Sequence, residues 1–257
     1  MSDITLNHAF AIILIFIRVG TIMFFLPFLG GKTVPFGLKA GMAFFLALIE
    51  WSILNSVSMP VTLFQLLGFA VEQLLIGLCV GFMISCIFSA VQAAGEIVGM
   101  QIGFSIVNVF DPENQQPESV ISRYFYISAV MIFFSIGGHH YLVRTIHESF
   151  TTIPLGRFML SGNIFPIILN ETSIMLITAI KISSPVLMTI LISNIGMGII
   201  AKTVPQINVF VVGMPLNIGI GITTLYVTMS VFLTVFSSHM DSVFGRVLKM
   251  LPFLNGG

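Results

Sequence analysis

Long apolar runs, separated by short polar interruptions, fill most of this chain. The runs of spanning length are Ala9–Gly30, Val34–Ile53, Val61–Val91, Val120–Gly138, Ser173–Ile200 and Leu216–Phe236. About 20 apolar residues make a helix long enough to cross the hydrocarbon core of a bilayer. The pattern therefore predicts an all-α protein of the integral membrane type, with about six long helical segments arranged as helical hairpins.

Two segments interrupt this pattern and predict irregular connections. Gln92–Ser119 and Ala201–Asn217 mix apolar residues with glycine, proline, glutamine and asparagine. Irregular backbone cannot face lipid, because its N–H and C=O groups would lack partners there. Each connection is therefore expected either outside the bilayer or buried in protein. Pro185 is also expected to kink the fifth segment, which gives a fold with broken helices.

Four charged residues lie inside the apolar runs, at Arg18, Glu50, Glu72 and Lys181. A charge at the bilayer centre costs about 3 kcal/mol or more, so such residues normally face protein or water. We expect them to find partners in a larger assembly, partly on other chains. Ion pairing within the chain, for example of Lys181 with Glu72, is the alternative.

The composition supports a membrane protein and gives no indication of a nucleic-acid partner. Of the 257 residues, 56% are hydrophobic and 8% are charged, with ten basic and ten acidic residues. A soluble domain carries about a quarter charged residues. One Trp and four Tyr are too few for the usual aromatic belts at the membrane interfaces, which favours a surface that faces other subunits. Cys79 and Cys86 are expected to be core residues.

Motifs of catalysis and phosphate binding are absent from the sequence. It has no Gly-x-Ser-x-Gly elbow and no phosphate-binding glycine loop followed by Lys-Ser/Thr. The cluster of His139, His140, His147 and Glu148 includes Arg144, whose charge would repel a metal cation, so we interpret it as an interfacial polar cap. The prediction is a protein that is not an enzyme and holds no metal or cofactor.

Short motifs of glycine, proline and polar residues recur along nearly the whole chain. They are Gly95-Glu96, Gly99-Met100-Gln101, Gly103-Phe104-Ser105, Asp111-Pro112, Gly138-His139-His140, Glu148-Ser149-Phe150, Pro154-Leu155-Gly156, Pro205-Gln206-Ile207-Asn208-Val209-Phe210, Gly213 and Pro215-Leu216. Together they resemble the FliR family of flagellar and type III secretion export-gate membrane proteins. Two positions depart from the family pattern. Asn217 stands where Lys is frequent, and Glu113–Glu118 is more polar than the family norm.

The resemblance implies a subunit of the pore that exports unfolded flagellar proteins, in the bacterial inner membrane at the flagellar basal body. Its partners would be FliP-type and FliQ-type subunits in one hetero-oligomeric pore, much of it lifted out of the bilayer plane, with an FlhB-type subunit and an FlhA-type export ring docked to it. Residues 1–171 would correspond to a FliP-like part and residues 172–257 to a FliQ-like hairpin. The competing interpretation from the apolar pattern is a secondary transporter with a broken-helix substrate site.

Two sets of functional residues follow. Because a narrow apolar constriction dewets and stops ions, the apolar part of the loop near residues 99–118 is expected to plug the pore, with Gly99 and Gly103 supplying backbone freedom. The plug set is Met100, Gly103, Phe104, Ile106, Val107, Asn108, Val109, Phe110, Asp111 and Pro112. The assembly and packing set is Arg18, Glu50, Glu72, Lys181, Pro205, Gln206, Asn208 and Pro215.

Overall fold

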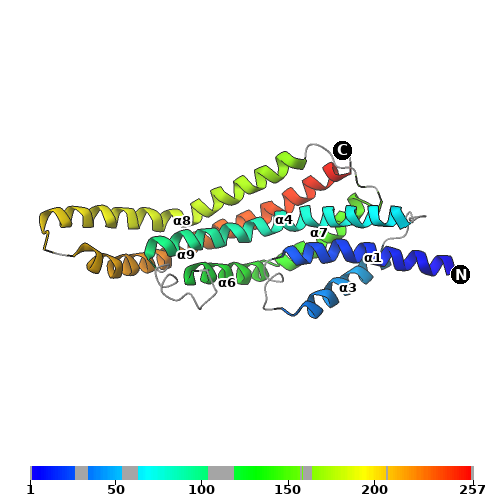
Figure 1. Cartoon of the computed structure of the whole chain (residues 1–257), viewed down its shortest axis with the longest axis horizontal. Coiled ribbons are helices and arrows are strands. Elements are labelled where there is room, and N and C mark those ends of the chain that lie inside the picture. The colour runs from blue at the N-terminus through cyan, green and yellow to red at the C-terminus, as the bar shows by residue number, and fades with distance from the viewer. Residues whose placement is uncertain are drawn as a thin grey trace. The chain divides into compact units, whose positions relative to one another are not determined.

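The computed structural model describes residues 2–26, 34–53, 63–103, 119–156, 158, 164–206 and 208–255. Within these ranges the chain is helical, which confirms the all-α prediction (Figure 1). The elements are α1 (Ser2–Phe25), α3 (Phe36–Ile53), α4 (Leu63–Ile102), α6 (Val120–Ser135), α7 (Gly138–Thr152), α8 (Ile164–Thr203), α9 (Val209–Met250) and the 3₁₀-helix η1 (Leu251–Leu254).

Several of these helices have the length and apolar character of membrane spans. Among the described residues, five pass as spans, and α6 with α7 would together make a broken sixth. The expected number of about six is therefore confirmed. The break itself was not predicted, because the apolar run Val120–Gly138 gives no hint of a second helix after it. Gly137 has φ +74°, a left-handed conformation that ends one helix before α7 begins.

The predicted bounds of the irregular connections were wrong. Helix α4 continues to Ile102, so residues 92–102 are regular helix. Helix α9 begins at Val209, so the second connection is only residues 204–208, and Pro215 lies inside α9 rather than at the end of a crossover. The polar and small residues of α4 misled the prediction because they serve contacts with a neighbouring helix, described below.

Helix α8 begins nine residues before the predicted Ser173, at Ile164. The polar residues in its first turns are tolerated because they have partners. The Glu171 carboxylate is buried and accepts two hydrogen bonds from the Arg246 guanidinium of α9, from Nε at 2.5 Å and from NH2 at 3.1 Å. Such a bidentate pair satisfies both charges and fixes the two side chains.

Two compact units make up the chain. The first comprises Met1–Cys86, Gly137–Thr172 and Met240–Gly257, and the second comprises Ile87–Ile136 and Ser173–His239. In the first unit α1 and α3 lie side by side (Figure 1). Helix α4 crosses α1 closely at Gly77, where a Cβ atom would stand 2.7 Å from the Thr21 Cβ atom. The absence of a side chain at Gly77 thus permits this close approach, and Cys79 and Cys86 are buried as predicted.

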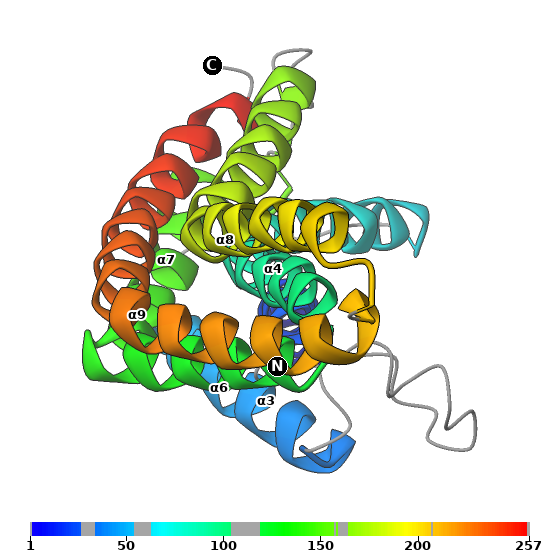
Figure 2. The same ribbon diagram turned by 90° about the vertical axis from the view of Figure 1, so that its left-hand side faces the viewer.

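The core of the second unit is aromatic. Phe88 of α4 meets Phe133 of α6 and Phe236 of α9 edge-on, each at 5.8 Å between ring centroids. Phe125 of α6 stacks on Phe232 of α9 at 5.0 Å, and α6 runs beside α9 in both views (Figures 1 and 2). These contacts hold α6 against α9 through Phe125 and against α4 through Phe133.

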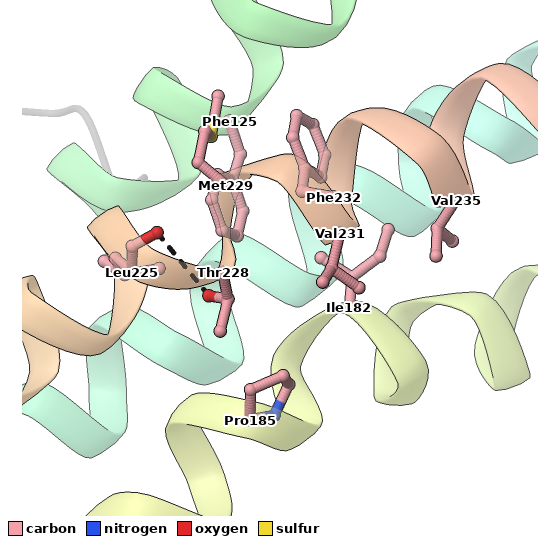
Figure 3. A pocket seen from close by; sticks show the side chains of 9 residues that line it. All are labelled: Phe125, Ile182, Pro185, Leu225, Thr228, Met229, Val231, Phe232 and Val235. Atoms are coloured by element: carbon pink, nitrogen blue, oxygen red, sulfur yellow. Dashed lines mark hydrogen bonds between the residues drawn. The ribbon is translucent and has the colours of Figure 1, made fainter.

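Pro185 lies within the continuous helix α8, facing α9 near Thr228 and Val231 (Figure 3). A void of about 10 Å³ beside it is barely the size of one water molecule, so it is no ligand site. Proline has no N–H to donate to the carbonyl of Lys181 four residues earlier. The Ser184 hydroxyl donates to that carbonyl instead, at 2.9 Å.

Candidate functional site

Two features define the candidate site: the contact between the end of α4 and the start of α6, and a buried polar cluster around Arg18. Gly103 follows α4, and its φ of +98° lets the chain leave the helix. The Gly103 N–H still donates to the carbonyls of Gly99 and Met100, each at 3.2 Å. Gly103 therefore fixes where the loop departs from α4.

A set of hydrogen bonds joins the far end of the loop to α4. We call this set the clasp; it consists of Gln92, Gly95 and Glu96 of α4, with Ser119 and Ser122 at the start of α6. The Ser119 N–H donates to Glu96 Oε1 at 2.8 Å, and the Ser119 hydroxyl donates to the Gly95 carbonyl at 3.3 Å. The Ser122 hydroxyl donates to the Gln92 carbonyl at 3.0 Å.

Ser119 is also the N-cap of α6. Its hydroxyl oxygen accepts the Ser122 N–H at 3.0 Å, which satisfies one of the unpaired donors of the first turn. The carboxylate of Glu96 lies at the same helix end, where the positive end of the α6 dipole favours an anion. The clasp thus stabilises the first turn of α6 while holding it on α4.

Gly95 and Gly99 make room for this contact. A Cβ atom on Gly95 would lie 2.4 Å from the Ser122 Cα atom, and one on Gly99 would lie 2.5 Å from the Ser119 hydroxyl oxygen. Both glycines are within regular helix. Gly99 is therefore a packing residue in this structure, which corrects the expectation that it supplies hinge freedom.

The last turn of α4 also packs against α9. A Cβ atom on Gly221 of α9 would lie 2.5 Å from Ile102 Cγ1, so the absence of a side chain there admits Ile102. Ile102 is buried, whereas Met100 on the same turn has 59% of its surface exposed. Of the predicted plug residues, the structure describes Met100 and Gly103, and Phe104 to Pro112 lie outside the described residues.

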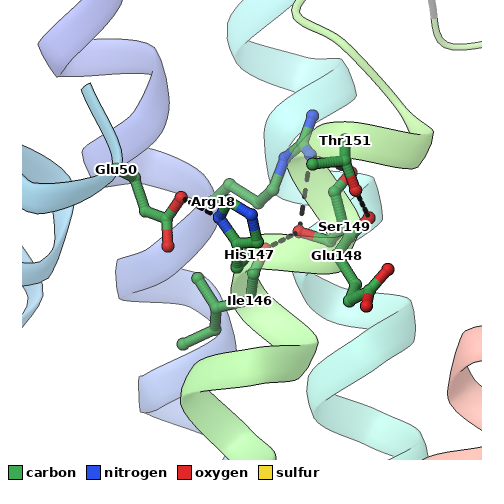
Figure 4. A network of polar contacts seen from close by, with 7 residues as sticks. All are labelled: Arg18, Glu50, Ile146, His147, Glu148, Ser149 and Thr151. Carbon is green, nitrogen blue, oxygen red and sulfur yellow. Dashed lines mark hydrogen bonds and ion pairs between the residues drawn. The ribbon is translucent and has the colours of Figure 1, made fainter. Parts of the chain in front are cut away.

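The second feature is Arg18, which is fully buried in the middle of α1. Its guanidinium donates to Gln73 Oε1 of α4 at 2.7 Å, to the Ser149 carbonyl at 2.7 Å and to the Ile153 carbonyl at 2.9 Å. It also lies 4.1 Å from the centroid of the Phe150 ring. Figure 4 shows Arg18 beside the last turn of α7.

The position of Arg18 explains how a charge can be buried there. The carbonyls of Ser149 and Ile153 stand at the C-terminal end of α7, where the helix dipole is negative. The Ser149 carbonyl accepts the Ile153 N–H as well as the Arg18 guanidinium. Glu72 of α4 adds an electrostatic attraction to Arg18 and accepts a hydrogen bond from the backbone of Phe158. Arg18 thus ties α1, α4 and α7 together.

A second polar contact links α3 to α7. Glu50 is buried, and its Oε2 atom lies 3.0 Å from His147 Nδ1 (Figure 4). Arg18 and Glu50 therefore find partners within the chain. Lys181 is exposed on α8, and its pairing with Glu72 stays a prediction.

The turn between α8 and α9 holds the other predicted assembly residues. Pro205, Gln206 and Asn208 are all exposed on this chain, and their role in assembly stays a prediction. The Asn208 carbonyl accepts the N–H groups of residues 211 and 212 and so starts α9. Further along α9, Asn217 accepts from the Ser193 hydroxyl and donates to Asn194 Oδ1, both at 3.0 Å, which joins the two arms of the hairpin.

The sequence analysis did not identify the residues that hydrogen-bond to Arg18 or that form the clasp. Gln73, Ser119 and Ser122 were not singled out, and Glu96 was noted only within a family motif. The signal that could have found the clasp is the pair of small residues four apart on α4, opposite Ser-x-x-Ser at the start of the next helix. Among the described residues, no three His, Cys, Asp or Glu side chains gather as a metal site would require.

Comparison with known proteins gives a single family. A family model described as "Bacterial export proteins, family 1" matches residues 9–243. The flagellar biosynthetic protein FliR of Bacillus subtilis is 36% identical over 233 residues, which cover 88% of this chain and 88% of the relative. The FliR of Escherichia coli is 30% identical over 91% of this chain and 88% of its own length, and that of Aquifex aeolicus is 29% identical over 91% and 90%.

Proposed function

Because the chain belongs to family 1 of the bacterial export proteins, we propose that it is a non-enzymatic subunit of the flagellar type III protein export gate. In this proposal it forms a pore with FliP-type and FliQ-type subunits, through which unfolded flagellar proteins leave the cell. Its loop between α4 and α6 closes the pore. The complex lies in the bacterial inner membrane at the flagellar basal body and docks an FlhB-type subunit and the FlhA-type export ring.

The length of the apolar helices is the observation that carries the proposal of partner subunits. Helices α4 and α8 have 40 residues each and α9 has 42, which is about 60 Å of helix apiece. The hydrocarbon core is about 30 Å thick, so each of these helices is about twice as long as one span requires.

Lipid therefore cannot cover the whole of these helices. Exposed apolar side chains nevertheless occur along α8 from Phe165 to Ile200 and along α9 from Val211 to Leu233. Apolar surface on this scale, outside the hydrocarbon core, marks contacts with other proteins. This supports the multi-subunit pore. The division of the chain into a FliP-like part, residues 1–171, and a FliQ-like hairpin, residues 172–257, stays a prediction, and its boundary falls within α8.

The clasp supports the assignment of the plug. It holds Ser119 against Gly95 and Glu96 in the last turns of α4, so the segment that contains Phe104, Ile106 and Val107 begins and ends at the same end of α4. Deleting Ile106–Phe110 in the assembled complex should raise ion conductance across the membrane and leave the complex intact. A matched control is the exchange of Glu113–Pro117 for a Gly/Ser stretch of equal length, which keeps the apolar residues. If the deletion instead caused the complex to disassemble, with no ion leak from the complex that remained, the assignment of these residues as a plug would be wrong.

The α8–α9 turn is proposed as an assembly contact. Gln206 and Asn208 are exposed on the single chain and would become buried against a neighbouring subunit, where an unpaired amide costs about 1–3 kcal/mol. Gln206→Ala and Asn208→Ala should lower the yield of complex. If assembly stayed intact and the membrane became leaky, the turn rather than the loop would be the gate.

Co-purification tests the proposal as a whole. The chain extracted in mild detergent should come out with two smaller polytopic subunits, and the chain expressed alone should aggregate. Recovery of a monodisperse, thermally stable monomer would instead favour a self-sufficient transporter.

A further inference from the structure

Lys181 is a charged residue near the middle of the long apolar helix α8. Its side chain is exposed, and it forms no hydrogen bond or ion pair with another residue in the described part of the chain. Arg18 and Glu50, by contrast, are buried and paired within the chain. We propose that Lys181 forms an ion pair with a carboxylate that another export subunit presents from an apolar helix. This inference rests on the proposed function, because it names the chemistry of one contact in that assembly.

Lys181 belongs to a row of side chains along one face of α8, which we call the α8 stripe. The stripe consists of Ile177, Lys181, Ser184, Met188, Leu191 and Ile195. Its members follow each other at alternating intervals of four and three residues, which is the spacing with which one helix packs along another. The four apolar members are exposed, from 49% at Ile177 to 63% at Met188. From Ile177 to Ile195 the stripe covers about 27 Å of helix, enough for several turns of a partner helix.

The opposite face of α8 is covered within the chain. Ala179, Ile182, Val186 and Ile190 are buried there. Ile182 and Pro185 lie toward α9 (Figure 3). At 100° per residue, Lys181 and Met188 lie on the other side of the helix from Val186 and Ile190. The α8 stripe is therefore the face that the single chain leaves open.

Neither water nor lipid alone suits the α8 stripe. In water its apolar side chains would stay exposed, and a contiguous apolar surface of this kind marks a contact with another molecule. In lipid Lys181 would be an unpaired charge, which is rare because of its cost and normally requires a partner. A helix that combines apolar side chains with one Asp or Glu meets both demands. This holds wherever α8 lies relative to the membrane.

A second copy of this chain is a poorer source of the carboxylate. Most of the carboxylates that the structure describes already interact within the chain, and these are Glu50, Glu72, Glu96, Glu148 and Glu171. Asp241 is exposed on α9, but Ser237, Ser238 and Ser242 are its neighbours in the sequence, so it does not stand in an apolar stretch. A different subunit is therefore the partner to which the charge and the apolar surface of the α8 stripe point.

An apolar carbodiimide tests the ion pair in membranes that contain the full chain with its co-purifying subunits. The reagent activates a carboxylate and joins it to an amine in direct contact, and mass spectrometry of the linked peptides identifies both residues. We expect the peptide that contains Lys181 to be joined to an Asp or Glu of another export subunit. Lys181→Arg should abolish this link, because a guanidinium does not form the amide, while its charge keeps the complex assembled.

Charge variants test whether the contact supports assembly. Lys181→Glu should lower the amount of co-purified subunits per chain about tenfold or more, because it places two like charges in one interface. Lys181→Met should cause a smaller loss, since it leaves the carboxylate unpaired without repelling it. The control is Lys249→Glu, which reverses an exposed charge on the last turn of α9 and should leave the amount unchanged.

Two results would overturn the proposal. One is a link from Lys181 to a carboxylate of this chain, such as Glu72, whether in the same copy or in a second one. The other is equal co-purification for Lys181→Glu and the unaltered chain, which would show that Lys181 faces water or lipid headgroups. The unaltered chain tests the proposed function separately: if it came out of the membrane without other subunits, the proposed function would fail. If it co-purified with them and Lys181→Glu had no effect, only the ion pair would be wrong.

Discussion

Glu96 accepts the backbone N–H of Ser119 at 2.8 Å, and this hydrogen bond joins the two ends of the segment between α4 and α6. The two residues are 23 positions apart in the sequence. Closing such a segment costs conformational entropy, which the clasp offsets with hydrogen bonds and a favourable interaction of the carboxylate with the α6 dipole. The clasp therefore joins α4 and α6 through described residues alone.

The first prediction concerns the carboxylate of Glu96. Glu96→Leu leaves the Ser119 N–H without its acceptor and should destabilise the protein by about 1–3 kcal/mol. Glu96→Gln keeps an oxygen acceptor and should lose less than half of that. The control is Glu148→Leu, because Glu148 is only half-buried and its 3.6 Å contact with the exposed Arg144 is an ion pair of small effect. Thermal unfolding of the purified complex measures the loss of stability in each variant. A loss for Glu148→Leu equal to that for Glu96→Leu would contradict the prediction.

The second prediction concerns Gly95. The atom closest to a Cβ at this position would be the backbone Cα of Ser122, which cannot move aside as a flexible side chain can. In Gly95→Ala the new Cβ atom would stand 2.4 Å from the Ser122 Cα atom, so α6 must move away from α4. We expect a loss of stability of about 1–3 kcal/mol, the usual range for overpacking, and lower accumulation of the chain in membranes. Gly68→Ala has nothing within 4 Å of its Cβ atom and should be neutral. Normal accumulation of Gly95→Ala would mean that α6 is not held in this position.

Arg18 gives the third prediction, which separates charge from shape. Arg18→Leu leaves Gln73 Oε1 and the carbonyls at the end of α7 without the donors that serve them here, and should destabilise the protein by about 3 kcal/mol or more. Arg18→Lys keeps the charge but should rescue little, since one ammonium cannot replace the planar fork of donors. Arg144→Leu removes an exposed arginine as the control. The midpoint of chemical unfolding reports the differences, and full rescue by lysine would show that charge alone matters.

The sequence predicted the class and the main helices because apolar runs of spanning length need no tertiary information. The sequence-based prediction was wrong or incomplete for residues whose role depends on the neighbouring helix against which they pack. Gly95, Gly99 and Gln92 suggested irregular backbone, yet they are helical because α6 packs against them. Likewise Arg18 was recognised as a buried charge, but its partners Gln73 and Ser149 come from helices 55 and 131 positions away. Such pairings follow from the fold and not from local pattern.

The fourth prediction concerns the carbonyl that Pro185 leaves without a helical donor. The Ser184 hydroxyl donates to the Lys181 carbonyl at 2.9 Å, and in Ser184→Ala that carbonyl would lose this donor. In an apolar environment such a loss costs about 1–3 kcal/mol. Ser237 provides a matched control on α9, since its hydroxyl donates to the Thr234 carbonyl at 3.1 Å in the same i to i−3 geometry.

The difference between the two serines lies in the backbone. Residue 238 is not proline, so the Thr234 carbonyl keeps its regular helical N–H donor when the Ser237 hydroxyl is removed. Ser237→Ala should therefore change stability by less than about 0.5 kcal/mol. Hydrogen exchange along α8 provides a local readout, because loss of the Ser184 hydroxyl should speed exchange around Lys181 and leave α9 unchanged. Equal effects of the two alanine variants on stability would show that the carbonyl next to Pro185 is satisfied by another group.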